Sequence, residues 1–232
     1  MVLFLKNREV SKEEKMDDPN CDAVLLDNTY RQFVTINRLL SKWKYVYKRF
    51  LKPKMSVGES YTVLDIGAGG GDVPLSLITW AEADGYTLTI TAIDPDPRAF
   101  DYMLKQDLPN TLTLRCCSTF DLLETGESFD FVISNSVLHH IPESELKPFL
   151  ESSQLLAKRL AIHNDIVRND FAYLGFAILS KLFFHKSFIS DDGLLSVRRS
   201  FTKKELEKLM PTKWRLGSAF PFRHLLIYEA VV

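Results

Sequence analysis

The chain has 232 residues, of which 46% are hydrophobic and 25% are charged, and its 29 Lys and Arg against 30 Asp and Glu give a net charge of −1. These values describe a globular protein with a sizeable core, and they exclude a disordered or fibrous chain. Because the chain has no excess of positive charge, we expect no nucleic-acid partner and no attraction to an anionic membrane surface.

Cysteine content and hydropathy predict a cytoplasmic protein. The three cysteines, Cys21, Cys116 and Cys117, do not form the spacing of a disulfide framework or a metal site. No apolar run is long enough to span a bilayer, and charged residues interrupt the short apolar opening of the chain. We therefore expect a protein without membrane insertion, present as a monomer or homodimer.

Residues 1–60 are predicted to form a helical cap. Their charged opening is expected to be extended or poorly ordered, whereas residues 27–50 carry an aromatic-rich apolar stripe at steps of three and four. This spacing predicts an amphipathic helix, which proline and glycine end near Lys52. The stripe either packs on the core or forms a lid over a ligand pocket, and in the second case Tyr30 and Phe33 are substrate-contacting residues.

From residue 61 to residue 232, strands and helices alternate, which predicts one α/β domain with a helical insertion near 165–200. The expected strands are Thr62–Ile66, Leu88–Ile93, Thr111–Cys116, Phe129–Ser134, Arg159–Asn164, Lys213–Ala219 and His224–Val231. The expected helices are Val73–Ala83, Pro97–Leu104, Ser144–Lys158, the apolar run Phe171–Phe184, and a helix that a capping box of Thr202 and Glu205 begins. The insertion is expected to cover the open end of the sheet.

Residues 63–72 read Val-Leu-Asp-Ile-Gly-Ala-Gly-Gly-Gly-Asp, an apolar strand that leads into a glycine-rich turn. Glycine lacks the Cβ that would block a ligand, and the following helix points unpaired N–H groups at bound polar atoms. The pattern therefore predicts a nucleotide-like ligand, with a ligand-free turn as the less favoured alternative. The third glycine that a dinucleotide site requires is replaced by Asp72, which argues against NAD.

Asp65, Gly67, Gly69 and Gly71 give Asp-x-Gly-x-Gly-x-Gly, which resembles the nucleotide-binding signature of the class I S-adenosylmethionine-dependent methyltransferases. The resemblance implies a Rossmann-like, seven-stranded, mostly parallel sheet with helices on both faces. It also implies S-adenosylmethionine as cofactor and S-adenosylhomocysteine as product. In such a site the turn, which includes Ala68, lies under the methionine moiety, and Asp65 holds the ammonium end.

Two further strand ends are predicted to complete the cofactor site. Asp94, followed by Pro95, ends the second strand, where a carboxylate can accept both ribose hydroxyls. The alternative use of Asp94 is a helix N-cap, for which Asp96 is better placed.

After the third strand, Ser118 and Thr119 stand where members of the family often carry an aspartate that binds the adenine amino group. A serine hydroxyl can still accept that hydrogen bond. Asp121 is the alternative if the loop is displaced.

Residues 128–142 contain a Phe-Asp strand followed by His139 and His140, and they resemble the fourth motif of the same family. Asn135, at the strand end, is expected to orient the cofactor. One histidine is a candidate general base, and the alternative is that the pair caps and packs the loop. We predict no metal, because no Cys or carboxylate stands at ligand spacing.

The flanks of the domain are predicted to select the acceptor. His163, at the end of the fifth strand, and Arg198 are candidate substrate contacts. The aromatic cap and the apolar insertion predict a small, partly hydrophobic acceptor, aromatic, quinone-like or polyketide-like, as in quinone and polyketide biosynthesis, methylated on oxygen or carbon. The alternatives are an RNA-modifying methyltransferase and a non-catalytic module that binds S-adenosylmethionine.

Overall fold

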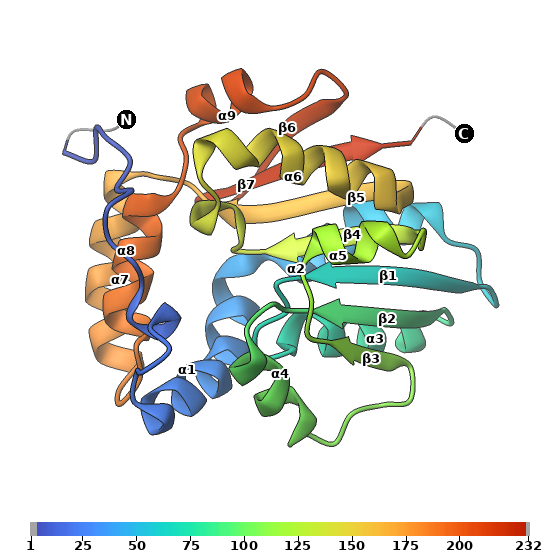
Figure 1. Cartoon of the computed structure of the whole chain (residues 1–232), viewed down its shortest axis with the longest axis horizontal. Helices are drawn as coiled ribbons and strands as arrows, with labels where there is room; N and C mark the ends of the chain where they lie inside the picture. The colour runs from blue at the N-terminus through green and yellow to red at the C-terminus, as the bar shows by residue number, and fades with distance from the viewer. Residues whose placement is uncertain (1–3, 231–232) are drawn as a thin grey trace.

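A seven-stranded sheet with the strand order β3-β2-β1-β4-β5-β7-β6 forms the centre of the molecule (Figure 1). The structure is a computed structural model and describes residues 4–230, so the expected end of the last strand at Val231 lies outside the described residues. The strands are β1 (Ser60–Ile66), β2 (Thr87–Ile93), β3 (Leu112–Arg115), β4 (Phe129–Asn135), β5 (Ala157–Ile166), β6 (Trp214–Ala219) and β7 (Arg223–Glu229). Strands β1 to β5 pair in parallel, and β7 is antiparallel to β5 and to β6.

Helices cover both faces of this sheet, as the sequence predicts. They are α1 (Ala23–Ile36), α2 (Trp43–Val46), α3 (Asp72–Ala83), α4 (Pro97–Leu104), α5 (Thr119–Glu124), α6 (Glu143–Leu156), α7 (Asp170–Phe183), α8 (Ile189–Arg199) and α9 (Lys203–Leu209). Short 3-10 turns are η1 (Lys15–Asp17), η4 (Lys52–Lys54) and η5 (Leu138–His140), and π-helical turns are η2 (Asn37–Ser41) and η3 (Tyr47–Leu51). The predicted Rossmann-like, mostly parallel fold is confirmed.

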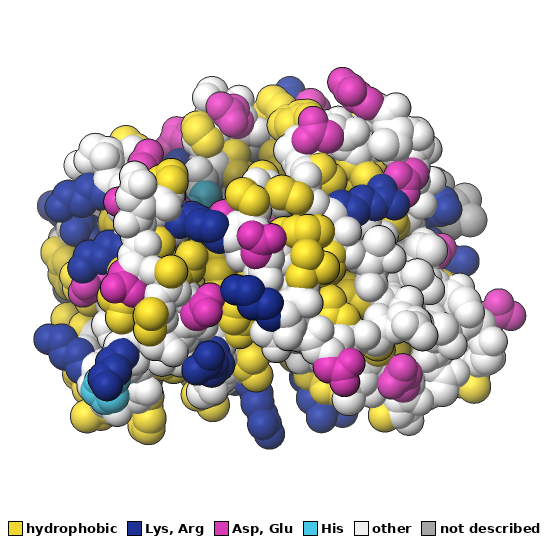
Figure 2. All heavy atoms as spheres, turned by 60° about the horizontal axis from the view of Figure 1, so that its bottom comes forward, with side chains coloured by type: hydrophobic (Ala, Val, Ile, Leu, Met, Phe, Trp, Pro, Cys, Tyr) yellow, Lys and Arg dark blue, Asp and Glu magenta, His cyan; other side chains and the backbone are white. Residues whose placement is uncertain are grey.

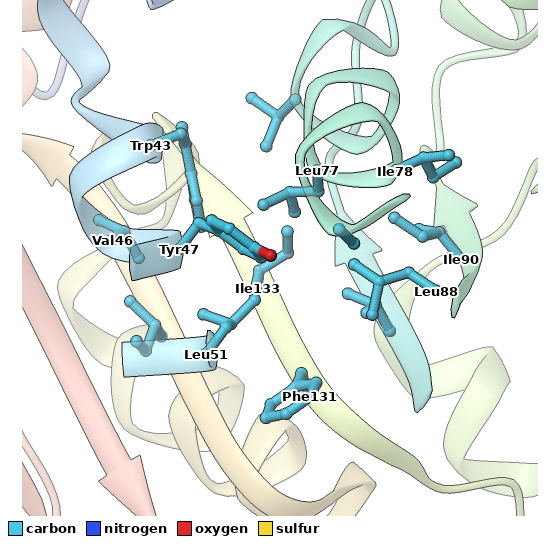
Figure 3. Packing of buried hydrophobic residues seen from close by; sticks show 14 of the residues in the cluster. Trp43, Val46, Tyr47, Leu51, Leu77, Ile78, Leu88, Ile90, Phe131 and Ile133 are labelled. Atoms are coloured by element: carbon cyan, nitrogen blue, oxygen red, sulfur yellow. The ribbon is translucent and has the colours of Figure 1, made fainter. Parts of the chain in front are cut away.

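Alternating side chains of the strands build two hydrophobic cores, one on each face. Along β1, Val63 belongs to the core beneath α2 and α3, whereas Leu64 belongs to the core beneath α6. In the first core, Trp43 and Tyr47 of the cap approach Leu77 of α3 over the strands (Figure 3). The cap thus shares its core with the sheet, and its separate status as a domain stays a prediction.

The cap differs from the single helix expected over residues 27–50. Helix α1 begins earlier, because the Asp22 carboxylate accepts hydrogen bonds from the backbone N–H groups of Val24 and Leu25. The helical path breaks at Lys42, whose φ of 60° is left-handed. Trp43 then starts α2 in a new direction, which turns the following aromatic side chains onto the core. The predicted end near Lys52 agrees with the last turn, η4.

Two helices were not expected from the sequence. Ser118 and Asp121 form a capping box that begins α5 directly after β3, where we expected a loop. The polar segment that follows the apolar run of α7 forms α8, which packs against α7 at one end of the sheet (Figure 1). The helix predicted from Thr202 is confirmed as α9, with its capping box. Among residues 4–230, no helix is both long enough and apolar enough to cross a membrane.

Candidate active site

A cavity of about 720 Å³ lies at the carboxyl ends of the central parallel strands. Its floor is made by the residues that follow β1, β2 and β4, and α1, α7 and α8 form its walls. Strand order reverses between β1 and β4, and ligands of open α/β sheets bind at such a reversal. The cavity size is that of a small-molecule site.

The glycine turn after β1 forms one side of this cavity. Gly67 and Gly69 have φ values of 67° and 53°, a left-handed conformation that favours glycine. A Cβ on Gly67 would lie 2.6 Å from Val137 Cγ2, so no side chain fits there. Gly67, Ala68 and Gly69 line the cavity, whereas Gly71 does not, because it serves as the N-cap of α3.

Three carboxylates gather beside the turn, on Asp65, Asp72 and Asp94, and all of them line the cavity. Burial raises the pKa of Asp65 well above its ordinary value, and the charges of Asp72 and Asp94 raise it further. The Asp65 Oδ1 atom is buried and has no hydrogen-bond partner among the described residues. An orphaned acceptor among like charges is the environment that a positively charged ligand would stabilise.

Asp94 holds the turn rather than capping a helix. Its Oδ2 accepts a hydrogen bond from the Gly69 N–H at 2.9 Å, and its Oδ1 accepts one from the Asp96 N–H at 3.0 Å. Asp96 is the N-cap of α4, as expected. Pro95, between them, lines the cavity.

Ser118 and Thr119 lie in a second, smaller cavity of about 210 Å³, and not in the main one. The two cavities share Gly67, Pro95 and Val137 in their walls. The Ser118 hydroxyl lies 2.7 Å from Asp121 Oδ2 within the capping box.

Asn135, at the end of β4, is held from three sides. Its Oδ1 accepts hydrogen bonds from Trp43 Nε1 and from the Arg223 guanidinium, each at 2.9 Å, and its Nδ2 donates to Asn37 Oδ1 at 3.1 Å. Arg223 also donates to Asn164 Oδ1 at 2.7 Å. The amide of Asn135 therefore ties the cap to the floor of the cavity.

His139 and His140 line the cavity among three carboxylates. His139 Nδ1 lies 2.8 Å from Asp165 Oδ1, and His139 Nε2 lies 3.4 Å from Glu14 Oε1. His140 repeats the arrangement, with Nδ1 at 3.3 Å from Asp17 Oδ2 and Nε2 at 4.0 Å from Glu14 Oε1. We call His139, His140 and Glu14 the histidine–glutamate cluster.

Neighbouring charges shift the pKa values of His139 and of its partner Asp165. Burial lowers the pKa of His139, but the charge and hydrogen bonds of Asp165 and Glu14 outweigh burial and raise that pKa to about 9. For Asp165, burial is likewise outweighed, and the neighbouring His139 and Arg223 charges lower its pKa to about 2. His139 is enclosed, whereas a third of the His140 side chain is exposed toward the cavity.

The N-terminal segment, residues 8–18, places Glu14 and Asp17 beside the two histidines. It runs along α8 (Figure 1). The Asp192 carboxylate of α8 accepts hydrogen bonds from the backbone N–H groups of Lys15 and Met16 at 2.8 and 3.0 Å. Ser196 Oγ, one turn later, donates to Glu14 Oε1 at 2.7 Å. The charged opening of the chain is extended, which was one of the two alternatives expected from the sequence. It closes one wall of the cavity.

The predicted substrate residues divide into two pairs. Tyr30 and Phe33 of α1 line the cavity. His163 and Arg198 do not: Arg198 forms an ion pair with Glu9 at 2.9 Å, outside the cavity. His163 is fully buried on the face of β5 that points away from the cavity, because successive residues of a strand alternate between its two faces.

We expect acid to destabilise the fold through His163. Its Nδ1 lies 2.7 Å from Ser134 Oγ, its ring stacks on Trp214, and burial lowers its pKa to about 3 from 6.5. The unfolded chain therefore binds a proton that the folded chain excludes, and the free energy of unfolding falls as the pH drops below about 6.5. At pH 5 the loss due to His163 is about 2 kcal/mol.

Urea unfolding at about pH 7 and pH 5 checks this expectation. His163→Gln should reduce the loss of stability between the two pH values, and the exposed His185→Gln should leave it unchanged. Equal losses in the wild type and in His163→Gln would contradict the expectation.

The fold is that of the class I methyltransferases. Residues 63–159 match the family described as "Methyltransferase domain", and the chain is an S-adenosylmethionine-dependent methyltransferase. The sequence is not significantly similar to any curated protein.

Solved structures support the same fold. The plantazolicin methyltransferase BpumL, solved in complex with SAH, matches with a TM-score of 0.66 at 15% identity, over 93% of this chain and 92% of that chain. The magnesium protoporphyrin IX methyltransferase ChlM from Synechocystis PCC 6803, solved with bound SAM, gives 0.51 at 16% identity, over 85% and 82%. An O-methyltransferase family protein from Burkholderia thailandensis gives 0.59 at 16% identity, over 86% of this chain and 57% of that chain.

Proposed function

We propose that this enzyme methylates an oxygen or carbon atom of a small, partly hydrophobic acceptor that binds in the main cavity. The observation that carries the proposal is the layout of this cavity. Its lining combines the glycine turn, the histidine–glutamate cluster and apolar residues of α1, α7 and α8. An acceptor that fits this lining has an apolar body and a polar group that meets the cluster.

The residues beside the glycine turn fit S-adenosylmethionine. The left-handed turn of Gly67 and Gly69 lines the cavity with backbone, and the unpaired Asp65 Oδ1 offers an acceptor to an ammonium group. Asp94 lines the cavity with a carboxylate whose remaining lone pairs suit two ribose hydroxyls. We propose these residues, with Ala68 and Pro95, as the cofactor site, and Gly71 as a residue that shapes the turn.

The second cavity supports a place for the adenine ring. It adjoins the turn at Gly67 and Pro95, and apolar side chains such as Ile93 and Phe149 line it. Ser118 and Thr119 lie in its wall, so the proposed adenine site still includes the two residues that the sequence predicts for it. We propose that shape and backbone contacts recognise adenine, because the Ser118 hydroxyl both donates to Asp121 Oδ2 and accepts from the Asp121 N–H within the capping box.

The chain's residues mainly position the acceptor. S-adenosylmethionine, when bound, supplies a methyl group that its sulfonium charge has already activated, so alignment is the main requirement. Tyr30 and Phe33 contact the apolar body of the acceptor from α1, and the cluster binds its reactive hydroxyl. The hypothesis that His139 or His140 acts as a general base stays a prediction.

The charge distribution on the face shown in Figure 2 gives no support to an RNA substrate. On the face shown in Figure 2, Lys and Arg side chains are interspersed with Asp and Glu, and the net charge of the chain is −1. RNA-binding surfaces concentrate positive charge. We therefore propose a small molecule as the partner.

An acceptor screen with radiolabelled S-adenosylmethionine tests the proposal. Phenols, quinols and polyketide-like enols form one panel, and total RNA, protein and peptides form the second. We expect label in members of the first panel. Labelling confined to RNA or protein would overturn the proposed acceptor class.

We further propose a cytoplasmic location and a monomeric or homodimeric state. Cys21, Cys116 and Cys117 are all free thiols, which supports a reducing compartment.

A further inference from the structure

We propose that Glu14, His139 and His140 bind a divalent first-row transition metal ion, with open coordination positions toward the cavity. One ligand atom from each of these three residues lies within 4.8 Å of the other two. Ligands that share a zinc ion at about 2 Å stand roughly 3–4 Å apart, so small side-chain movements close the site. Two histidines and one glutamate form a ligand set of open zinc sites.

The orientation of the imidazole rings supports a metal site. Each histidine turns its Nε2 toward Glu14 and places its Nδ1 near a different carboxylate, that of Asp165 or Asp17. Metal-bound histidines usually donate their second ring N–H to a carboxylate, which fixes the ring. Here two rings with this pattern converge on one acidic side chain.

The glutamate has an outer partner as well. Ser196 Oγ donates to Glu14 Oε1 at 2.7 Å, and Glu14 itself is only 4% exposed. The backbone of the histidine pair is braced, because the Arg8 guanidinium donates to the His139 carbonyl at 2.9 Å. Each of the three proposed ligands therefore has a neighbour that fixes its position.

Charge and access also favour a cation. Three carboxylates, on Glu14, Asp17 and Asp165, surround two imidazoles at a largely buried position. All three proposed ligands line the cavity, so an ion has a route in and faces the acceptor space. An oxygen atom of the acceptor would complete its coordination. This role of the ion rests on the proposed function, whereas binding of the ion does not.

Metal titration of the full-length protein tests the site without cofactor or acceptor. After dialysis against a chelator, Zn²⁺ binding is measured by calorimetry, and Co²⁺ binding by its visible absorption. We expect one ion per chain and the spectrum of a four- or five-coordinate Co²⁺ ion. Glu14→Gln should weaken binding by about 100-fold, and Asp17→Asn, which alters only an outer partner, by about 10-fold.

Matched controls distinguish the site from adventitious binding. Glu9→Gln changes a neighbouring carboxylate of the same N-terminal segment that pairs with Arg198 and not with the cluster, so it should bind Zn²⁺ like the wild type. Circular dichroism and S-adenosylhomocysteine binding confirm that each variant folds. Absence of stoichiometric binding, or binding that Glu14→Gln leaves unchanged, would overturn the metal site. Methylation by the metal-free enzyme in the acceptor screen would leave the proposed function standing.

Discussion

Replacing Asp94 with asparagine should lower the affinity for S-adenosylhomocysteine by about 100-fold. The Asp94 carboxylate already accepts hydrogen bonds from the N–H groups of Gly69 and Asp96, and we propose that it also accepts two ribose hydroxyls. An amide nitrogen accepts none of these bonds. Two lost hydrogen bonds to a charged group, at about 1.5 kcal/mol each, account for the expected factor.

Calorimetry of the wild type and variants with S-adenosylhomocysteine measures this loss. Asp121→Asn is a matched control, because Asp121 is an exposed carboxylate that caps α5 and lines neither cavity. We expect Asp121→Asn to bind like the wild type. Unchanged affinity in Asp94→Asn would remove Asp94 from the ribose site, and no binding by the wild type would refute the cofactor site itself.

The glycine-turn side of the cavity was predictable because its signals are local. The apolar run of β1, the glycine turn and α3 follow one another directly in the sequence, and parallel strands place Asp94 beside them. The capping box of Ser118 and Asp121 was also visible as Ser-x-x-Asp, so α5 could have been predicted from it. By contrast, a lysine gives no signal for the left-handed turn at position 42.

The histidine–glutamate cluster was not predictable from spacing. Glu14 lies 125 positions before His139, in a polar segment with no periodicity, and contact between them depends on packing of that segment against α8. The predicted absence of a metal rests on the residues near the histidines in the sequence, and Glu14 is far from them. His163 was misplaced for a related reason: its position at a strand end was clear, whereas the face it occupies depends on the strand register.

Glu14→Gln should lower the turnover number by about 100-fold and leave S-adenosylhomocysteine affinity unchanged. The substitution preserves size, and the glutamine oxygen can still accept the hydrogen bond from Ser196. It removes the negative charge at the point where both histidine Nε2 atoms converge. The acceptor hydroxyl then loses the polar group that orients it, while the residues of the glycine turn are unchanged.

Steady-state rates with the best acceptor from the screen, together with calorimetry, separate these two effects. Glu9→Gln tests whether the N-terminal segment itself tolerates the loss of a carboxylate, and it should retain the wild-type turnover number. If Glu14→Gln lost cofactor affinity in parallel with turnover, the N-terminal segment would have a general structural role. Wild-type turnover in Glu14→Gln would place the reacting group away from the histidines. A selective loss of turnover would instead assign this segment to acceptor chemistry, because it delivers an acidic side chain to the two histidines that line the cavity.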